Sequence, residues 1–200
     1  SDWIKKNMPK DGLIHLVDVT SGKAVLNIVG PMSREVLAKV SESDISNSAI
    51  PFSKSCEIVV GAAQVLAARI GYVGELGYEL HIPSEYAAHV YDLLWNAGKE
   101  AGIANVGYRA IESLRLEKGY VYWSSDVTPD YTPIEAGLGF RVHLKSKGDF
   151  LGRTILEKQK NNKPTRKLCT FVTDEKLSVT GGETILLGGA VVSLATSVGF

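Results

Sequence analysis

Pairs of β-rich runs separated only by turn residues are the feature that most constrains how this 200-residue chain folds. Residues 14–19 and 23–29 are joined by a short Thr-Ser-Gly turn, and the stretch 56–83 is interrupted by glycines near Gly61 and Gly74. Successive strands joined by tight turns pair antiparallel, whereas a doubly wound parallel sheet alternates strand and helix regularly. The pattern therefore predicts an α+β fold in which helices pack on antiparallel sheets.

Helices are predicted where apolar residues recur at spacings of three and four. The clearest one begins at Ser84, a residue type that caps helices, and ends near Gly102. Further helices are expected over residues 31–41, 108–118 and 150–160. They supply the helical layer of the α+β fold.

The last quarter of the chain has a different composition. A polar run, Asn161 to Pro164, is typical of a linker, and the short β-like segments 167–173 and 184–195 follow it, separated by glycine pairs. These segments are typical of a small barrel or sandwich. So few strands would leave open edges, so we also expect the natural chain to continue beyond residue 200.

The balanced charge of the chain excludes several partners. Lysine and arginine together number 22, as do aspartate and glutamate, so neither nucleic acid nor an anionic membrane is an expected partner. No stretch approaches the roughly 20 apolar residues of a membrane-spanning helix. The two cysteines lie outside any Cys-x-x-Cys pair and the four histidines are far apart, so no metal site is expected. The remaining expectation is a soluble protein whose ligand is a small molecule.

Two charged residues are candidates for a binding site. Glu79 lies inside the apolar strand 76–82. A carboxylate in a strand usually faces solvent, but facing inward it would bind adjacent N–H and NH₂ donors, as in a guanidinium or the edge of a pterin ring. Arg109 begins a helix, where a cation opposes the helix dipole. Either Glu112, one turn later, compensates this charge, or Arg109 serves a ligand.

Four ordered motifs carry a resemblance that composition does not. They are Gly71-Tyr-Val-Gly-Glu-Leu-Gly-Tyr-Glu-Leu80, Gly107-Tyr-Arg-Ala-Ile-Glu-Ser-Leu-Arg-Leu-Glu-Lys-Gly119, Thr132-Pro-Ile-Glu-Ala-Gly-Leu138 and Asp149-Phe-Leu-Gly-Arg153. Together they resemble the glycine-cleavage T-protein (aminomethyltransferase) superfamily over essentially the whole chain. The second motif departs from the Ala-Arg-Asp-Ser/Thr-Leu-Arg-Leu-Glu-Ala-Gly pattern of T-proteins. This difference favours the C-terminal folate half of sarcosine and dimethylglycine dehydrogenases.

The resemblance implies roles for individual residues. Glu79 matches the glutamate that holds the pterin edge, Tyr72 matches a tyrosine of the same pocket, and Arg109 matches the arginine of the substrate pocket. The family's catalytic aspartate precedes a tryptophan. In this chain it either falls one residue before Ser1 or is replaced by Asp2 in a shifted register, so the chain on its own is expected to be inactive.

The resemblance also implies a function. Residues 1–144 would supply most of the α+β lobes that surround tetrahydrofolate, and residues 145–200 would form the start of a small, incomplete β-barrel. The bound tetrahydrofolate would capture the one-carbon unit of an iminium derived from an N-methylated glycine, giving 5,10-methylenetetrahydrofolate. FAD would belong to a separate domain of the same parent chain. The alternatives are a glycine-cleavage T-protein, which takes an aminomethyl group from a lipoyl carrier, and a non-catalytic relative resembling the regulatory subunit of pyruvate dehydrogenase phosphatase. The expected location is the mitochondrial matrix in a eukaryote and the cytoplasm in a bacterium.

Overall fold

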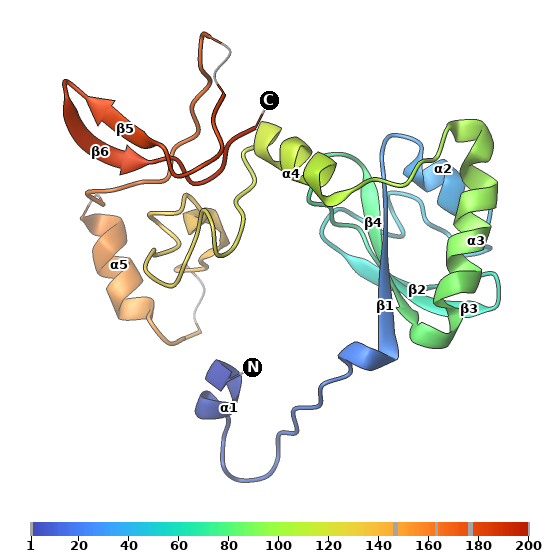
Figure 1. Ribbon diagram of the computed structural model, residues 1–200. Helices are drawn as coiled ribbons and strands as arrows, with labels where there is room; N and C mark the ends of the chain where they lie inside the picture. The colour runs from blue at the N-terminus through green and yellow to red at the C-terminus, as the bar shows by residue number, and fades with distance from the viewer. Residues whose placement is uncertain (1, 146–147, 163, 176–177, 200) are drawn as a thin grey trace. The chain divides into compact units, whose positions relative to one another are not determined.

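Four antiparallel strands form the sheet that organises the first part of the chain (Figure 1). The computed structural model describes residues 2–145, 148–162, 164–175 and 178–199. The stretch 56–83 contains three antiparallel strands, which confirms the prediction made from its glycine interruptions. In the sheet order β1-β4-β3-β2, the strands are β1 (Lys23–Val29), β2 (Ser55–Val60), β3 (Ala63–Ala68) and β4 (Gly77–Pro83).

Helices α2 (Ser33–Ala38) and α3 (Ala87–Gly98) cover one face of this sheet (Figure 1). Successive side chains of a strand point to opposite faces, so every second residue of β4 enters the core against these helices. The opposite face, here called the open face, carries the alternate residues of each strand. The core against the helices includes Tyr78, Leu80, Ile82, Val90 and Leu94.

Interresidue contacts divide the chain into two compact units, residues 1–105 and 106–200. The first unit contains the sheet, the helices packed on it and a short N-terminal helix. The described residues of the second unit contain two α-helices, a 3-10 helix and a two-stranded antiparallel hairpin. The remaining elements are α1 (Asp2–Asn7), η1 (Thr20–Gly22), η2 (Ser84–Tyr86), η3 (Lys99–Ala101), α4 (Tyr108–Glu117), η4 (Gly139–Arg141), α5 (Arg153–Asn161), β5 (Thr184–Leu187) and β6 (Ala190–Leu194).

The helix predictions hold, with shifted ends. The helix expected from Ser84 is a 3-10 turn followed by α3 and a second 3-10 turn, and it ends at Gly102, which adopts the left-handed conformation with φ of +73°. The helix predicted from residue 31 is shorter, and the one predicted from residue 150 begins at Arg153. Helix α1 was not expected.

Two strand predictions are wrong. Residues 14–19 form no strand and do not pair with β1, and residues 167–173 form no strand either. In both segments apolar side chains are largely exposed, for example Val17 at 72% and Val172 at 93%. A β-rich run forms a strand only when a neighbouring strand takes up the hydrogen bonds of its backbone. For residues 14–19 the expected partner was β1, but β1 pairs with β4.

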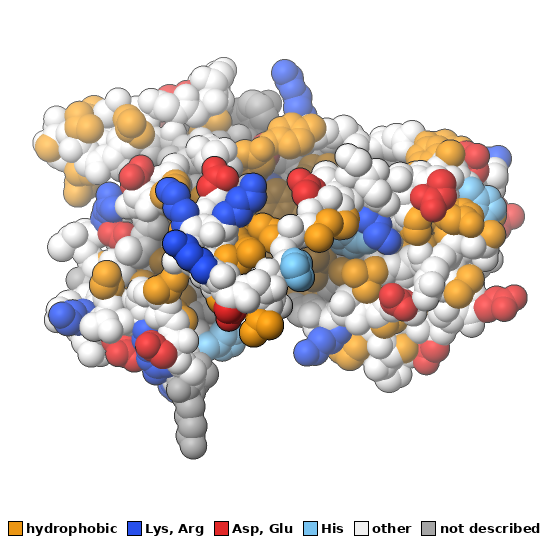
Figure 2. Space-filling view, turned by 90° about the horizontal axis from the view of Figure 1, so that it is seen from below, with side chains coloured by type: hydrophobic (Ala, Val, Ile, Leu, Met, Phe, Trp, Pro, Cys, Tyr) orange, Lys and Arg blue, Asp and Glu red, His pale blue; other side chains and the backbone are white. Residues whose placement is uncertain are grey.

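The expected small barrel is not confirmed. Within the described residues of 145–200 the strands are β5 and β6, paired with each other. Lys163 of the expected linker lies outside the described residues, and the domain boundary expected after residue 144 stays a prediction. In the described part of the chain no helix combines the length and apolarity needed to cross a bilayer. Figure 2 shows apolar side chains at the surface among acidic and basic ones.

Candidate functional site

Glu79 lies on the open face of the sheet, in the middle of β4. Its neighbours in the register are Asn27 on β1 and Ala68 on β3. The flanking residues Tyr78 and Leu80 are fully buried on the helix-covered face, so the alternation of β4 fixes the opposite direction for Glu79. Its side chain is 30% exposed. Glu79 is therefore neither a core residue nor a freely solvated one.

The carboxylate of Glu79 has one charged neighbour. Its Oε2 atom lies 3.8 Å from Nε2 of His81, a contact too long for a hydrogen bond. Among the residues that the structure describes, no hydrogen bond reaches either carboxylate oxygen. Both oxygens can therefore accept hydrogen bonds from a ligand.

Tyr72 lies in the loop that leads from β3 into β4, where it is half-buried. The glycines of this loop have structural roles: Gly74 has a φ of +75°, and a Cβ atom on Gly77 would lie 2.8 Å from Cγ1 of Val29. A backbone hydrogen bond from Gly30 to the Leu76 carbonyl, 2.8 Å long, holds the end of the loop against the end of β1. The glycine pattern thus serves the turn and the close pairing of two strands.

Arg109 is exposed in the first turn of α4, in the second unit. Compensation by Glu112, one of the two alternatives for Arg109, does not occur, because Glu112 pairs with Arg115 instead. In the described part of the chain the Arg109 side chain has no ion pair or hydrogen bond. Of the two alternatives for Arg109, the structure removes the local ion pair and leaves the ligand role as a prediction.

Arg115 is the most buried charged side chain of the second motif, at 1% exposure. It donates hydrogen bonds to Glu112, to Oδ2 of Asp126 at 2.6 Å, to the Tyr120 carbonyl at 2.8 Å and to the Ser197 hydroxyl at 2.6 Å. Burial alone would lower the pKa of Arg115, but its hydrogen bonds and charge contacts with the two carboxylates outweigh burial and raise that pKa. Arg115 therefore anchors α4 within the second unit.

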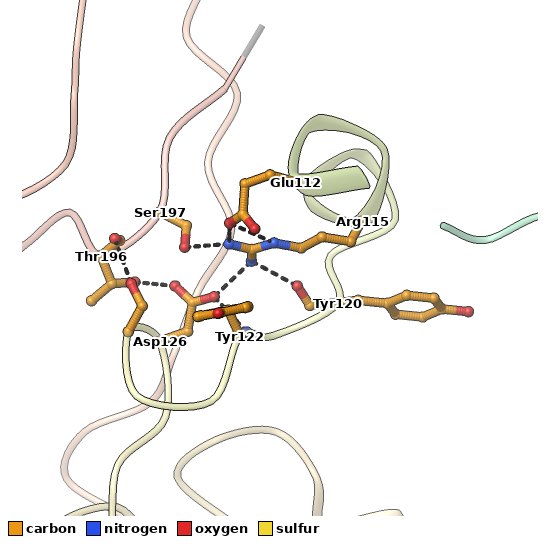
Figure 3. Close-up of polar contacts among 8 residues, drawn as sticks. Glu112, Arg115, Tyr120, Tyr122, Asp126, Thr196 and Ser197 are labelled. Carbon is orange, nitrogen blue, oxygen red and sulfur yellow. Dashed lines mark hydrogen bonds and ion pairs between the residues drawn. The ribbon is translucent and has the colours of Figure 1, made fainter. Parts of the chain in front are cut away.

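Asp126 completes this anchor, since it is also buried. Its carboxylate accepts hydrogen bonds from the Tyr122 backbone amide at 2.8 Å and from the Thr196 hydroxyl, besides that from Arg115 (Figure 3). Burial would raise the pKa of Asp126, but the hydrogen bonds from two hydroxyls, the amide and Arg115 outweigh it and hold that pKa below its usual range. The segment around Thr196 is thereby joined to α4.

Glu135 of the third motif also has a structural role. It accepts hydrogen bonds from the backbone amide and hydroxyl of Thr132, at 2.8 and 3.0 Å, and from Nε of Arg166 at 2.7 Å. The hydrogen bond from Arg166, together with those from Thr132, outweighs the effect of burial and lowers the pKa of Glu135 to about 2. In the fourth motif, Arg153 binds the Leu144 carbonyl at 2.7 Å.

Asp2 is exposed in the first turn of α1, none of whose residues is buried. Its proposed catalytic role stays a prediction. The described residues also contain no group of three or more histidine, cysteine, aspartate or glutamate side chains able to hold a metal ion.

The predicted site residues are distributed over both units. Tyr72 and Glu79 belong to the first unit, at the start and the middle of one loop-and-strand segment, whereas Arg109 belongs to the second unit. The sequence patterns did not single out Arg115, whose buried ion pair with Asp126 is structural. The available signal was its position four residues after Ile111, on the inward stripe of α4.

Comparisons with known proteins give a consistent result. Residues 1–146 match the model of the family described as GCVT N-terminal domain. Human mitochondrial sarcosine dehydrogenase is 43% identical over 177 residues, which are 88% of this chain and 19% of the relative. Human mitochondrial dimethylglycine dehydrogenase is 36% identical over a match that covers 98% of this chain and 23% of the relative. The chain thus spans about a fifth of the length of these relatives.

A solved structure shares the fold. Glycine cleavage system aminomethyltransferase T from Bartonella henselae superposes with a TM-score of 0.74 at 26% identity. The match covers 89% of this chain and 48% of that one. The antiparallel sheet with its packed helices is therefore an arrangement that this aminomethyltransferase also has.

Proposed function

Because the chain belongs to the GCVT N-terminal domain family, we propose that it binds tetrahydrofolate and positions it to take up a one-carbon unit. The half-buried carboxylate of Glu79 on the open face of the sheet is the observation that supports this proposal. The identity to sarcosine and dimethylglycine dehydrogenases supports an N-methylated glycine as the source of the one-carbon unit.

The residues present fit a pterin. Its 2-amino-4-oxo edge offers adjacent N–H and NH₂ donors, which a carboxylate binds through two parallel hydrogen bonds. Glu79 has both oxygens available for such a pair within the described part of the chain. The same face carries the apolar side chains Val25 and Leu66, 47% and 41% exposed, against which a flat ring can pack. Tyr72 is proposed to line the same pocket.

The remaining roles belong to the same proposal. When bound, tetrahydrofolate would supply the nucleophilic amine that takes up the one-carbon unit of an iminium. The products would be 5,10-methylenetetrahydrofolate and the demethylated amine. Arg109 is proposed to bind substrate, and Asp2, or an aspartate just before Ser1, to assist the attack. A FAD-containing domain of the same parent chain is proposed to form the iminium. The protein's part is to orient the two reactants and to exclude water that would hydrolyse the iminium.

Calorimetric titration of the chain with tetrahydrofolate tests the proposal. We expect Glu79→Gln to weaken binding by about 10- to 150-fold, because it removes charged hydrogen bonds worth about 1.5–3 kcal/mol. Glu75→Gln is the matched control, since Glu75 is an exposed glutamate of the same motif. Equal affinities of the Glu79→Gln variant and the unmodified chain would contradict the pterin site, and so would an equal loss in the control.

The aminomethyltransferase reading is the second candidate, and the superposition on the Bartonella henselae enzyme supports it. The two candidates differ in the donor of the one-carbon unit. A dehydrogenase-type protein transfers it from an oxidised N-methylated glycine, whereas an aminomethyltransferase takes it from a lipoyl carrier. Incubating the parent protein with each donor and measuring methylenetetrahydrofolate separates them, and binding without turnover of either donor would indicate the regulatory relative.

A further inference from the structure

His81 has a position that the folate-binding proposal does not use. It follows Glu79 by two residues on β4, so both side chains lie on the open face. Its Nε2 atom is 3.8 Å from Oε2 of Glu79, and the two side chains are 35% and 30% exposed. An imidazole therefore stands next to the carboxylate proposed to bind the pterin edge.

The residues directly opposite His81 in the sheet are apolar. Val25 on β1 and Leu66 on β3 lie directly opposite His81 in the register, so apolar side chains flank the imidazole on both sides. Directly opposite pairs in an antiparallel sheet place their side chains close together on the same face. Within the described residues Glu79 is the charged group that lies within 4 Å of the imidazole.

Two further charged residues share the open face, one on each side of the pair. Lys23 lies on β1 opposite Pro83, and Glu57 lies on β2 opposite Leu66. The Glu57 carboxylate accepts a hydrogen bond of 3.0 Å from the side-chain amide of Gln64. Among the described residues, Glu79, Lys23 and Glu57 are the charged side chains that the four strands place on the open face with His81.

We propose that His81 is a positioning residue for the Glu79 carboxylate, and that protonation of His81 weakens the binding of a ligand that donates adjacent N–H groups to this carboxylate. The inference rests on the proposed folate function. Neutral, the imidazole limits the orientations of the carboxylate. Protonated, it is a cation that attracts the carboxylate and competes with the N–H donors of the ligand for the same oxygens.

The test is the pH profile of tetrahydrofolate binding to the full chain. Histidine changes its charge between about pH 5 and 8, so the dissociation constant of the unmodified chain is expected to rise about three- to tenfold from about pH 8 to about pH 5.5, the size of one partly solvated charge contact. In the His81→Gln variant this change should be smaller than about twofold, beyond any change that titration of the ligand causes in both proteins. His89→Gln is the control, because His89 is exposed on α3, and it should keep the unmodified profile.

The Glu79→Gln variant separates failure of this inference from failure of the folate site. If Glu79→Gln weakens binding while His81→Gln keeps the full pH dependence, the role of His81 is refuted and the pterin site stands. If Glu79→Gln leaves binding unchanged, both fall. A merely structural role for His81 would lower the melting temperature and the affinity equally at every pH, which would also refute the proposal. A double variant, His81→Gln with Glu79→Gln, should be no more pH-dependent than Glu79→Gln alone.

Discussion

Asp126→Asn tests whether the buried ion pair with Arg115 holds α4 in the second unit. The substitution preserves shape but removes the charge that faces a guanidinium of 1% exposure. Removing one partner of a buried ion pair costs about 3–5 kcal/mol, because a buried charge is left uncompensated. Glu112 still pairs with Arg115, so we place the loss of unfolding free energy at the lower end, about 3 kcal/mol.

Hydrogen exchange of the α4 backbone amides measures this loss where it occurs. A change of about 3 kcal/mol corresponds to exchange that is about 100- to 200-fold faster when opening is at equilibrium. Asp130→Asn is the matched control, since Asp130 is exposed and nearby, and surface substitutions of this kind change stability by about 0.5 kcal/mol or less. Acceleration below about fivefold in Asp126→Asn, or equal acceleration in the control, would refute the argument.

Two further predictions concern stability. The pKa of Glu135 is about 2 in the folded protein against an ordinary value of 4.5, so its contribution to the free energy of unfolding is fully present above about pH 4.5 and is lost as the pH falls toward 2. Melting curves across this window should show a loss of stability in acid that the Glu135→Gln variant lacks. An unchanged pH dependence in that variant would contradict the assignment. Gly77→Ala should lower the unfolding free energy by about 1–3 kcal/mol in urea denaturation, because the added Cβ atom would lie 2.8 Å from a methyl group of Val29. Gly22→Ala is the control and should be nearly neutral, because a Cβ atom on Gly22 would meet open space.

The fold could be predicted where local sequence decides the structure. The glycines that interrupt residues 56–83 mark real turns, and the apolar spacing after Ser84 marks a real helix. Residues 14–19 have the same β-rich composition as β1 but form no strand. The composition of a segment indicates that it can form a strand. It does not indicate which other segment will pair with it, because the partner strand can lie far away along the chain. β1 pairs with β4, more than 45 residues later.

The candidate site shows the same limit. Strand alternation alone places Glu79 on the face opposite Tyr78 and Leu80, and the structure agrees. The partner of Arg115 could not be found this way, because Asp126 and Ser197 are 11 and 82 residues away. Hydrogen bonds to residues far along the chain decide whether a charged side chain has a structural role, and the apolar spacing of a helix does not predict those bonds.

The partners of the charged motif residues separate structural roles from binding roles. Arg115 and Glu135 are buried, and each is satisfied by hydrogen bonds from or to the protein itself. Exposed charges such as Glu75 are satisfied by water. Glu79 belongs to neither group: it has lost part of its hydration, yet within the described residues it gains only a contact of 3.8 Å with His81. Its oxygens are not occupied by hydrogen-bond donors of the described residues, so a ligand that donates two N–H groups can bind them in place of water. The pterin proposal therefore rests on Glu79 more than on any other motif residue.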